Sequence, residues 1–592
     1  MEPAPAPSFS GVYDASFLRG RCPQPGSNPG PVSEDCLFLN VFCNQNATSS
    51  QLAAVMVFIG GSDGLSTIRN LVSRGVVVVT VQYRLGALGF LNAPSSGIAQ
   101  NLGMLDQVQA LQITLAGQGD GACAVAAHSV SPLSAGLFQQ AILQSGSIYS
   151  CYQEQPTQSP QGPPSPGYLP PYQGDTTTIN SLYYDPGLQY QPLSPPSPST
   201  SSPYSPPPSS PPSSPYQYSS TNTNDDPSMI LAMQLCNVTA EQWRSGQLAG
   251  LRQCMTSLSV DVFVQTQGYR TSKWLIVRDN SFMPDSPDRL GNRRIPMIIG
   301  TVQDEDADYV FKMVADGTAL RQTEEQMFNG WFVRNIIANG YNVSAPQQNV
   351  NQNRPTQQPQ QPPPTPSPPS FVGGFSSNNN NVVYNNLQFS NTTLVSPQQQ
   401  QMMQSLKVIN QISSDAFGVS QSVSQVQLVQ STGSSCLIYQ FTHVSSIGRN
   451  SSQQIGGWRP VFRGQDNVFL FMSQTAWGSS RPTQEDFRVA DEMGQRWTQF
   501  AQTGQVSGWQ PSSNGQYGYC NLNSRPSMAG NYGGQARTVF NDQVQPLVQE
   551  ARGLPPRPSS SSSTANVVVN SQEGASSWSI SFSLPSFPLL PF

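Results

Sequence analysis

The residues with the clearest chemical meaning lie in the pentapeptide GQGDG, residues 117–121. A small residue at each end and one variable residue on either side of the centre form the frame of a nucleophile elbow. This is a sharp turn from a strand into a helix that presents one reactive side chain. The centre here is Gly119, which has no side chain. The segment therefore predicts the turn without the atom that would attack.

The composition of the chain limits the kinds of partner and cofactor that we expect. Only 10% of the 592 residues are Asp, Glu, Lys or Arg, and the net charge is −5. Because no Lys/Arg cluster is present, we expect no nucleic-acid partner. The nine cysteines show no C-x-x-C spacing typical of metal sites, so we expect disulfides, no metal and no cofactor.

Paired cysteines and five N-x-S/T sequons together favour an extracellular protein. The sequons lie at Asn46, Asn237, Asn342, Asn391 and Asn450. The start MEPAPAPSFSG lacks the basic and apolar regions of a signal peptide. The apolar tail SFSLPSFPLLPF is broken by prolines and is too short to span a membrane, so we expect no transmembrane segment.

The elements that would position the turn fall in three ordered segments. AVMVFIGGSDG and GVVVVTVQYRLGALGFL are β-branched runs typical of parallel strands buried on both faces. We expect one interrupted domain made of residues 8–150, 227–344 and 402–545. Two disordered inserts separate its parts, a Pro/Ser/Tyr-rich one at 151–226 and a Gln/Asn/Pro-rich one at 345–401, and a Ser/Pro-rich tail follows at 546–592.

The segment PTQEDFRVADEMGQRWTQFAQTG, residues 482–504, predicts the clearest helix. Thr483 and Asp486 have the spacing of a capping box, and Gly504 is placed to end the helix. One apolar stripe runs along it, formed by Phe487, Ala490, Met493, Trp497 and Phe500.

In the same order along the chain, these segments resemble the type-B carboxylesterase/cholinesterase family. The most specific match is SEDCLFLNVF, residues 33–42; others are VQYRLGALGFL, NLGMLDQVQAL, SPLSAGLFQQAILQSGS, PMIIGTVQDED and RWTQFAQTG. The resemblance implies an α/β-hydrolase fold, a central, mostly parallel sheet flanked by helices. Family members have more chain at the N-terminus and before the elbow, so we expect N-terminal strands and a segment before the turn to be missing.

The resemblance also assigns the catalytic positions. The family's serine falls on Gly119, its acid on Glu305 and its histidine on Arg463. The oxyanion loop falls on Gly60 and Gly61, without its histidine. Loss of nucleophile or base costs about a million-fold in rate, so the resemblance implies an inactive homologue. We expect Glu305 and Arg463 to form an ion pair, against the alternative that both face solvent.

Substitutes for the missing groups are poor. His128 and His443, the chain's two histidines, fall where the family carries histidines for packing or hydrogen bonding. Asp120 lies one position late for an elbow nucleophile, and a shift of register would put Gln118 where a small residue is needed. Ser62 has the setting of an ordinary loop residue.

Structural positions of the family are retained. The resemblance implies a buried ion pair between Arg84 and Asp106, whose one-sided loss costs about 3–5 kcal/mol. It also implies the disulfides Cys22–Cys36 and Cys236–Cys254, and more weakly Cys436–Cys520. No partner is assigned to Cys43, Cys123 or Cys151.

Serine-less relatives act through binding, so the resemblance implies a non-catalytic secreted protein with a binding, adhesion or matrix role. The partner would be an extracellular protein or matrix component. Nine of the 20 tyrosines lie between residues 152 and 218, where an extended chain would expose them. Two alternatives remain open: a residual carboxylic-ester hydrolase, and a defective or mis-assembled gene product.

Overall fold

The computed structural model describes most of the three ordered segments. The described residues are 1–4, 10–11, 13–24, 32–44, 53–60, 69–110, 113–153, 226–268, 274–315, 397–445, 447, 458–513 and 515–551. The two expected inserts and the tail lie almost wholly outside these ranges.

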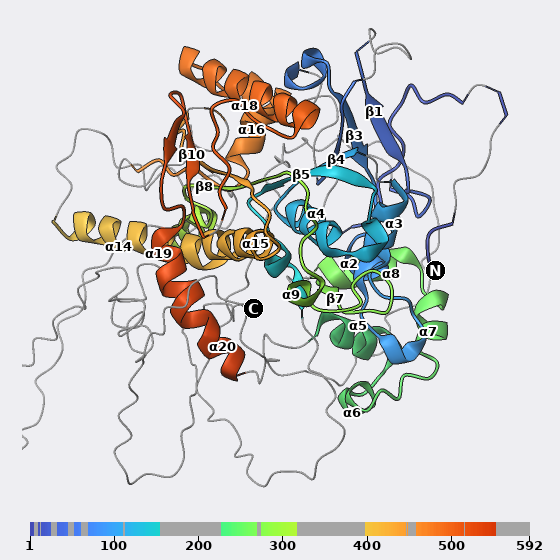
Figure 1. The fold of residues 1–592 in the computed structure, drawn as a ribbon. Helices are drawn as coiled ribbons and strands as arrows, with labels where there is room; N and C mark the ends of the chain where they lie inside the picture. Colours follow the sequence, from blue (N-terminus) through green and yellow to red (C-terminus); the bar gives the residue numbers. More distant parts are fainter. Residues whose placement is uncertain are drawn as a thin grey trace, which may run out of the picture.

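Within the described residues, nine strands form one sheet in the order β1-β3-β2-β4-β5-β8-β9-β10-β11 (Figure 1). The interior pairs, from β3 to β10, are parallel, whereas β1 and β11 pair antiparallel at the two edges. The strands are β1 Leu39–Phe42, β2 Val55–Ile59, β3 Val77–Val81, β4 Ile113–Gln118, β5 Phe138–Gln144, β8 Met297–Val302, β9 Leu437–Phe441, β10 Tyr519–Leu522 and β11 Ser527–Ala529. The mostly parallel sheet of the expected fold class is therefore present.

Helices cover both faces of this sheet (Figure 1), which explains why its central strands are apolar throughout. All six residues of β8 are buried. On one face lie α3 Leu102–Ala110, α4 Asp120–Val130 and α15 Ser420–Ser431. On the other lie the 3-10 turn η1 Val72–Arg74, α16 Gln465–Phe471, α17 Gln474–Gly478 and α18 Gln484–Thr503.

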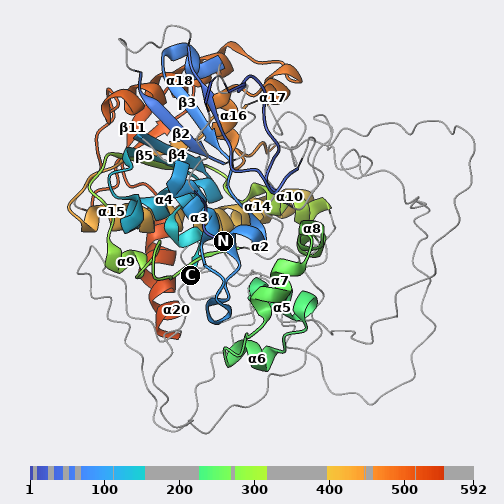
Figure 2. The ribbon, with the colours of Figure 1, turned by 90° about the vertical axis from the view of Figure 1, so that its right-hand side faces the viewer.

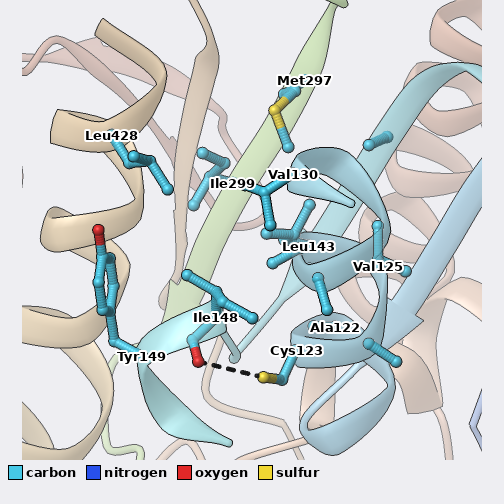
Figure 3. Packing of buried hydrophobic residues seen from close by; sticks show 14 of the residues in the cluster. Ala122, Cys123, Val125, Val130, Leu143, Ile148, Tyr149, Met297, Ile299 and Leu428 are labelled. Atoms are coloured by element: carbon cyan, nitrogen blue, oxygen red, sulfur yellow. Dashed lines mark hydrogen bonds between the residues drawn. The ribbon is translucent and has the colours of Figure 1, made fainter. Parts of the chain in front are cut away.

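Helix α4 is the element that follows the turn, and it is buried almost completely. Its sequence, DGACAVAAHSV, is rich in alanine, so it can approach the sheet closely. Figure 3 shows Val125 and Val130 of α4 beside Leu143 of β5 and Ile299 of β8. Every residue of α4 after Asp120 is buried, so the turn is anchored on its helical side.

A smaller helical group packs on α2 Gly86–Phe90, away from the sheet (Figure 2). It consists of α5 Pro227–Cys236, α6 Ala240–Arg244, α7 Leu251–Ser257 and α8 Val260–Gly268. The remaining elements are η2 Pro94–Ser96, η3 Pro132–Ser134, η4 Ile148–Ser150, the pair β6 Tyr152–Gln153 and β7 Ile276–Val277, α9 Pro287–Leu290, α10 Ala307–Ala315, α14 Pro397–Ser414, the π-helices η6 Asp415–Val419 and η8 Arg537–Val544, α19 Gly534–Ala536 and α20 Gln545–Ala551.

Helix α18 begins and ends where the sequence predicts. The Thr483 hydroxyl accepts from the Asp486 amide at 3.2 Å, and the Asp486 carboxylate accepts from the Thr483 amide at 2.7 Å. Gly504 caps the other end with φ 71°. The predicted stripe is buried except at Phe487, whose side chain is 51% exposed. Phe487 is therefore the member of the stripe that the core on this face of the sheet does not enclose.

Some expected boundaries shift. Helix α14 begins at Pro397, inside the expected insert, and α20 continues to Ala551, inside the expected tail. Strand β6 lies at the start of the first expected insert. Only two residues separate α3 from β4, yet β4 still pairs with β2 and β5 in the centre of the sheet. The short connection therefore leaves the strand that carries the turn in place.

Three disulfides link described residues. Cys22–Cys36 and Cys236–Cys254 are the two implied by the resemblance, and Cys123–Cys151 joins two cysteines to which no partner was assigned. The weaker Cys436–Cys520 pairing is wrong, because both cysteines are free thiols, and both are buried. Cys43 is also a free thiol, but it is exposed. None of the helices in the described ranges has the length and apolarity needed to cross a membrane.

Candidate functional site

The turn between β4 and α4 has the backbone of a nucleophile elbow. Gly119 has φ 60° and ψ −119° and is the N-cap of α4. Its amide donates to the Gln144 carbonyl at 2.9 Å, and its carbonyl accepts from the Cys123 amide at 3.0 Å. These bonds tie the turn to β5 on one side and to the first helical turn on the other. The chain therefore holds this strained conformation at two points.

The small residues around the turn are required by close backbone contacts. A Cβ on Gly117 would lie 2.4 Å from the Gly121 carbonyl carbon, and one on Gly121 would lie 2.0 Å from the Ile59 oxygen. A Cβ on Gly146 would lie 2.2 Å from the Gly119 oxygen. At Gly119 itself a Cβ would meet nothing closer than Arg463 Nη2, at 3.6 Å. The frame therefore needs glycine, whereas its centre has room for a side chain.

Arg463 fills the space in front of Gly119. It precedes α16, and its side chain is 20% exposed. Nη2 donates to the Ser145 carbonyl at 2.5 Å, and Nε lies 3.7 Å from Glu305 Oε2. The expected Glu305–Arg463 ion pair is thus present, and the alternative in which both side chains face solvent is wrong.

Glu305 follows β8 and is buried, with 2% of its side chain exposed. Its Oε1 accepts from the Val302 amide at 2.8 Å, whereas Oε2 has no hydrogen-bond partner. Burial raises the pKa of this carboxyl, and the nearby Arg463 guanidinium opposes that rise. The residue aligned with the family's acid therefore faces one cationic side chain, Arg463, and keeps one oxygen without a hydrogen bond.

A buried polar network that the sequence did not reveal supports the strand beside the turn. Asp466 Oδ2 accepts from the Tyr439 hydroxyl at 2.7 Å and from Gln144 Nε2 at 3.0 Å. Burial raises the pKa of Asp466. The backbone carbonyl of Gln144 accepts the hydrogen bond from the Gly119 amide. The network therefore holds in place the residue of β5 to which the turn is bonded. Polar residues at the end of an apolar strand, as in LQSGS, are the signal that could have indicated it.

The side chains of His128 and His443 form their hydrogen bonds elsewhere, not with Gly119, Glu305, Arg463 or Asp466. His128, inside α4, has Ser134 Oγ at 2.8 Å and Gln107 Oε1 at 3.0 Å, one on each ring nitrogen. Burial lowers the pKa of His128 to about 3. His443 Nε2 lies 2.9 Å from Asp486 Oδ1 at the start of α18. Both rings are thus engaged by structural partners.

The other residues considered for catalysis are placed as follows. Asp120 is exposed on the first turn of α4. Gly60 is described, with φ 134°, whereas Gly61 and Ser62 lie outside the described residues. No group of three His, Cys, Asp or Glu side chains within the described part of the chain is arranged to hold a metal ion.

The supporting positions are well formed. Arg84 Nε and Nη2 donate to the two carboxylate oxygens of Asp106 at 2.7 and 2.6 Å, and the Arg84 amide adds a third bond at 3.1 Å. Among the sequons, Asn237 is exposed at the end of α5. The others lie outside the described residues, at Asn46, Asn342, Asn391 and Asn450.

Comparison with known proteins agrees with this architecture. The model of the carboxylesterase family matches residues 1–162 and 213–540. A strand-to-helix turn on a mostly parallel sheet, together with this match, defines the class: the chain belongs to the carboxylesterase family.

Individual relatives match over a shorter region. Thyroglobulin of Rattus norvegicus is 37% identical over 172 residues, which cover 24% of this chain and 6% of thyroglobulin. Acetylcholinesterase-1 of Trittame loki is 36% identical over 183 residues, 25% of this chain and 33% of that enzyme. Juvenile hormone esterase of Tribolium castaneum is 39% identical over 167 residues, 24% of this chain and 27% of that enzyme. The aligned part therefore spans a third or less of each relative.

Proposed function

We propose that this chain is a non-catalytic member of the carboxylesterase family that acts by binding an extracellular protein or matrix component. The observation that carries the proposal is the position of Arg463. Its guanidinium stands 3.6 Å from the point where a side chain at residue 119 would begin. A guanidinium thus lies beside the centre of the turn, at the position that aligns with the family's histidine base.

The chemistry of the three positions supports an inactive site. Gly119 has no atom that could attack a carbonyl carbon. Arg463 remains protonated at all ordinary pH values, so it cannot accept a proton as an imidazole does. Glu305 retains its carboxylate but has no ring to orient. What remains is a folded turn with one buried ion pair.

Two features support an extracellular setting. Three disulfides link described residues, and such bonds persist in oxidising compartments. The sequon at Asn237 is exposed, so a glycosyltransferase could reach it. The similarity to part of thyroglobulin supports a role in which the family fold serves as one portion of a protein.

The proposal is tested by measuring hydrolysis of p-nitrophenyl acetate and p-nitrophenyl butyrate by the purified protein. We expect release of p-nitrophenol at the rate of buffer alone. Saturable turnover that disappears in an Asp120→Ala variant would overturn the proposal, because it would identify the exposed Asp120 as a nucleophile. An Asp261→Ala variant, which removes a carboxylate from the first turn of α8 instead, is the matched control.

A further inference from the structure

An open cavity lies on the face of the sheet opposite to α4, between η1 and the first turns of α18. It has a volume of about 470 Å³. Four of its lining residues belong to α18 Gln484–Thr503, which lies beside α16 in Figure 1. Its charged lining is formed by Arg69, Arg74, Arg488 and Asp491, and its apolar lining by Met472 and Phe487. None of these residues belongs to the turn at Gly119.

The charges in this cavity do not cancel. Arg74 forms an ion pair with Asp491. Arg69 donates to the neutral amide oxygen of Gln474, so its charge has no counterion there. The side chain of Arg488 makes no hydrogen bond or ion pair with any described residue. Two positive charges thus remain uncompensated in one cavity of a chain whose net charge is −5.

An aromatic surface lies beside these charges. Phe487 is 51% exposed, although it continues the stripe that buries the rest of α18. Its ring centroid lies 5.3 Å from that of Trp477, which is buried. Exposure of a large aromatic side chain at a cavity is more informative than exposure elsewhere, because such side chains supply contact area for ligands.

The walls of the cavity are held rigidly. The Asn70 amide donates to the carbonyls of Phe469, Leu470 and Ala490 at 3.4, 3.0 and 2.7 Å. It therefore ties the segment just before η1 to both α16 and α18. Gly494 allows this close approach, since a Cβ there would lie 2.3 Å from Asn70 Oδ1. The backbone that carries the lining residues is therefore held in place before a ligand binds.

We propose that this cavity binds a small aromatic anion. The ring of the ligand contacts Phe487 and Met472, and its phosphate, sulfate or carboxylate group lies between Arg69 and Arg488. Planar guanidinium groups bind such oxygens through paired, charge-assisted hydrogen bonds. This binding is independent of the state of the turn at Gly119, so it goes beyond the proposed function.

Phenyl phosphate is a suitable probe, and isothermal titration calorimetry with the purified chain measures its binding. Phenol and inorganic phosphate, each offering one half of the ligand, serve as comparisons. We expect phenyl phosphate to bind more tightly than either, with an affinity that falls as ionic strength rises. Arg488→Gln should weaken binding about tenfold, as expected for loss of one charge-assisted bond.

A matched control is Arg525→Gln, which removes another exposed arginine, between β10 and β11. It should leave the affinity for phenyl phosphate unchanged. Because Arg488 has no side-chain partner among the described residues, its variant should fold normally, and a thermal unfolding curve checks this. Absence of binding at millimolar phenyl phosphate, or equal weakening by Arg525→Gln, would overturn the proposal.

Discussion

Two ion pairs of this molecule have the same burial but different geometry. The side chains of Arg84 and Arg463 are each 20% exposed, and those of Asp106 and Glu305 are 1% and 2% exposed. Arg84 meets both oxygens of Asp106, at 2.6 and 2.7 Å. Arg463 reaches Glu305 at 3.7 Å and directs Nη2 to the Ser145 carbonyl.

The difference shows that burial alone does not make an ion pair strong. Asp106 receives a bidentate guanidinium and a backbone amide, so its charge is satisfied. Glu305 keeps one oxygen without a hydrogen bond, which is costly in the interior. We infer that the Arg84–Asp106 pair supports the fold. The Arg463–Glu305 pair neutralises a charge at a site where the family places catalysis.

The largest expected effect is at the bidentate pair. Asp106→Asn should lower the free energy of unfolding by about 3–5 kcal/mol, because it leaves the Arg84 guanidinium without its counterion. Urea denaturation followed by circular dichroism measures this loss. A double Arg84→Met/Asp106→Leu variant should be more stable than Asp106→Asn alone. A smaller loss for Asp106→Asn than for Glu305→Gln would contradict the comparison.

The next effect concerns the disulfide that joins α4 to the segment after β5. Replacing Cys123 and Cys151 by alanine should cost about 2–4 kcal/mol, since the bond closes a 28-residue separation in the unfolded chain. Thermal unfolding under non-reducing conditions is the measurement. Cys43→Ala, at an exposed free thiol, is the control and should change nothing. Equal stability of both variants would show that Cys123–Cys151 does not support the turn.

The centre and the frame of the turn should respond differently to alanine. Gly119→Ala should cost about 1–3 kcal/mol, because a side chain is strained at φ 60° although space is available. Gly121→Ala should cost more, since its Cβ would press against the Ile59 oxygen. The urea denaturation midpoints of the two variants measure this difference. If Gly121→Ala were the milder change, close backbone contacts would not explain why the frame glycines are retained.

The smallest effect is expected at the looser pair, and its sign depends on pH. Because burial raises the pKa of Glu305 above that of an ordinary glutamate, the folded protein loses stability as pH rises from the ordinary pKa through the raised one. Glu305→Gln removes this loss. The variant should therefore become more stable relative to the natural chain at pH 7 than at pH 4. Urea titrations at both pH values test this, and the opposite trend would show that Arg463 stabilises the carboxylate fully.

Much of the fold could be predicted because its signals are local. The capping box of α18 and the glycine frame of the turn each fix backbone geometry over a few residues. The family positions of Arg84 and Asp106 were likewise visible in YRLG and LDQ. These features depend on residue type at short spacing, which a sequence displays directly.

Features that depend on packing between distant segments could not be predicted. Cys123 and Cys151 are brought together by α4 and β5, and their spacing gave no sign of it. The Asp466 network joins residues from β5, β9 and α16. Phe487 belongs to the apolar stripe of α18, yet it is 51% exposed. Such contacts depend on where elements stop, which periodicity does not show.

The central claim is that no side chain at the turn between β4 and α4 is activated for attack. An intact-mass measurement after incubation with a fluorophosphonate tests it most directly, since these reagents modify a hydroxyl that has an adjacent base. We predict that the mass of the protein stays unchanged while a carboxylesterase treated in parallel is fully modified. A stoichiometric adduct on any serine beside Gly119, such as Ser145 or Ser147, would contradict the account.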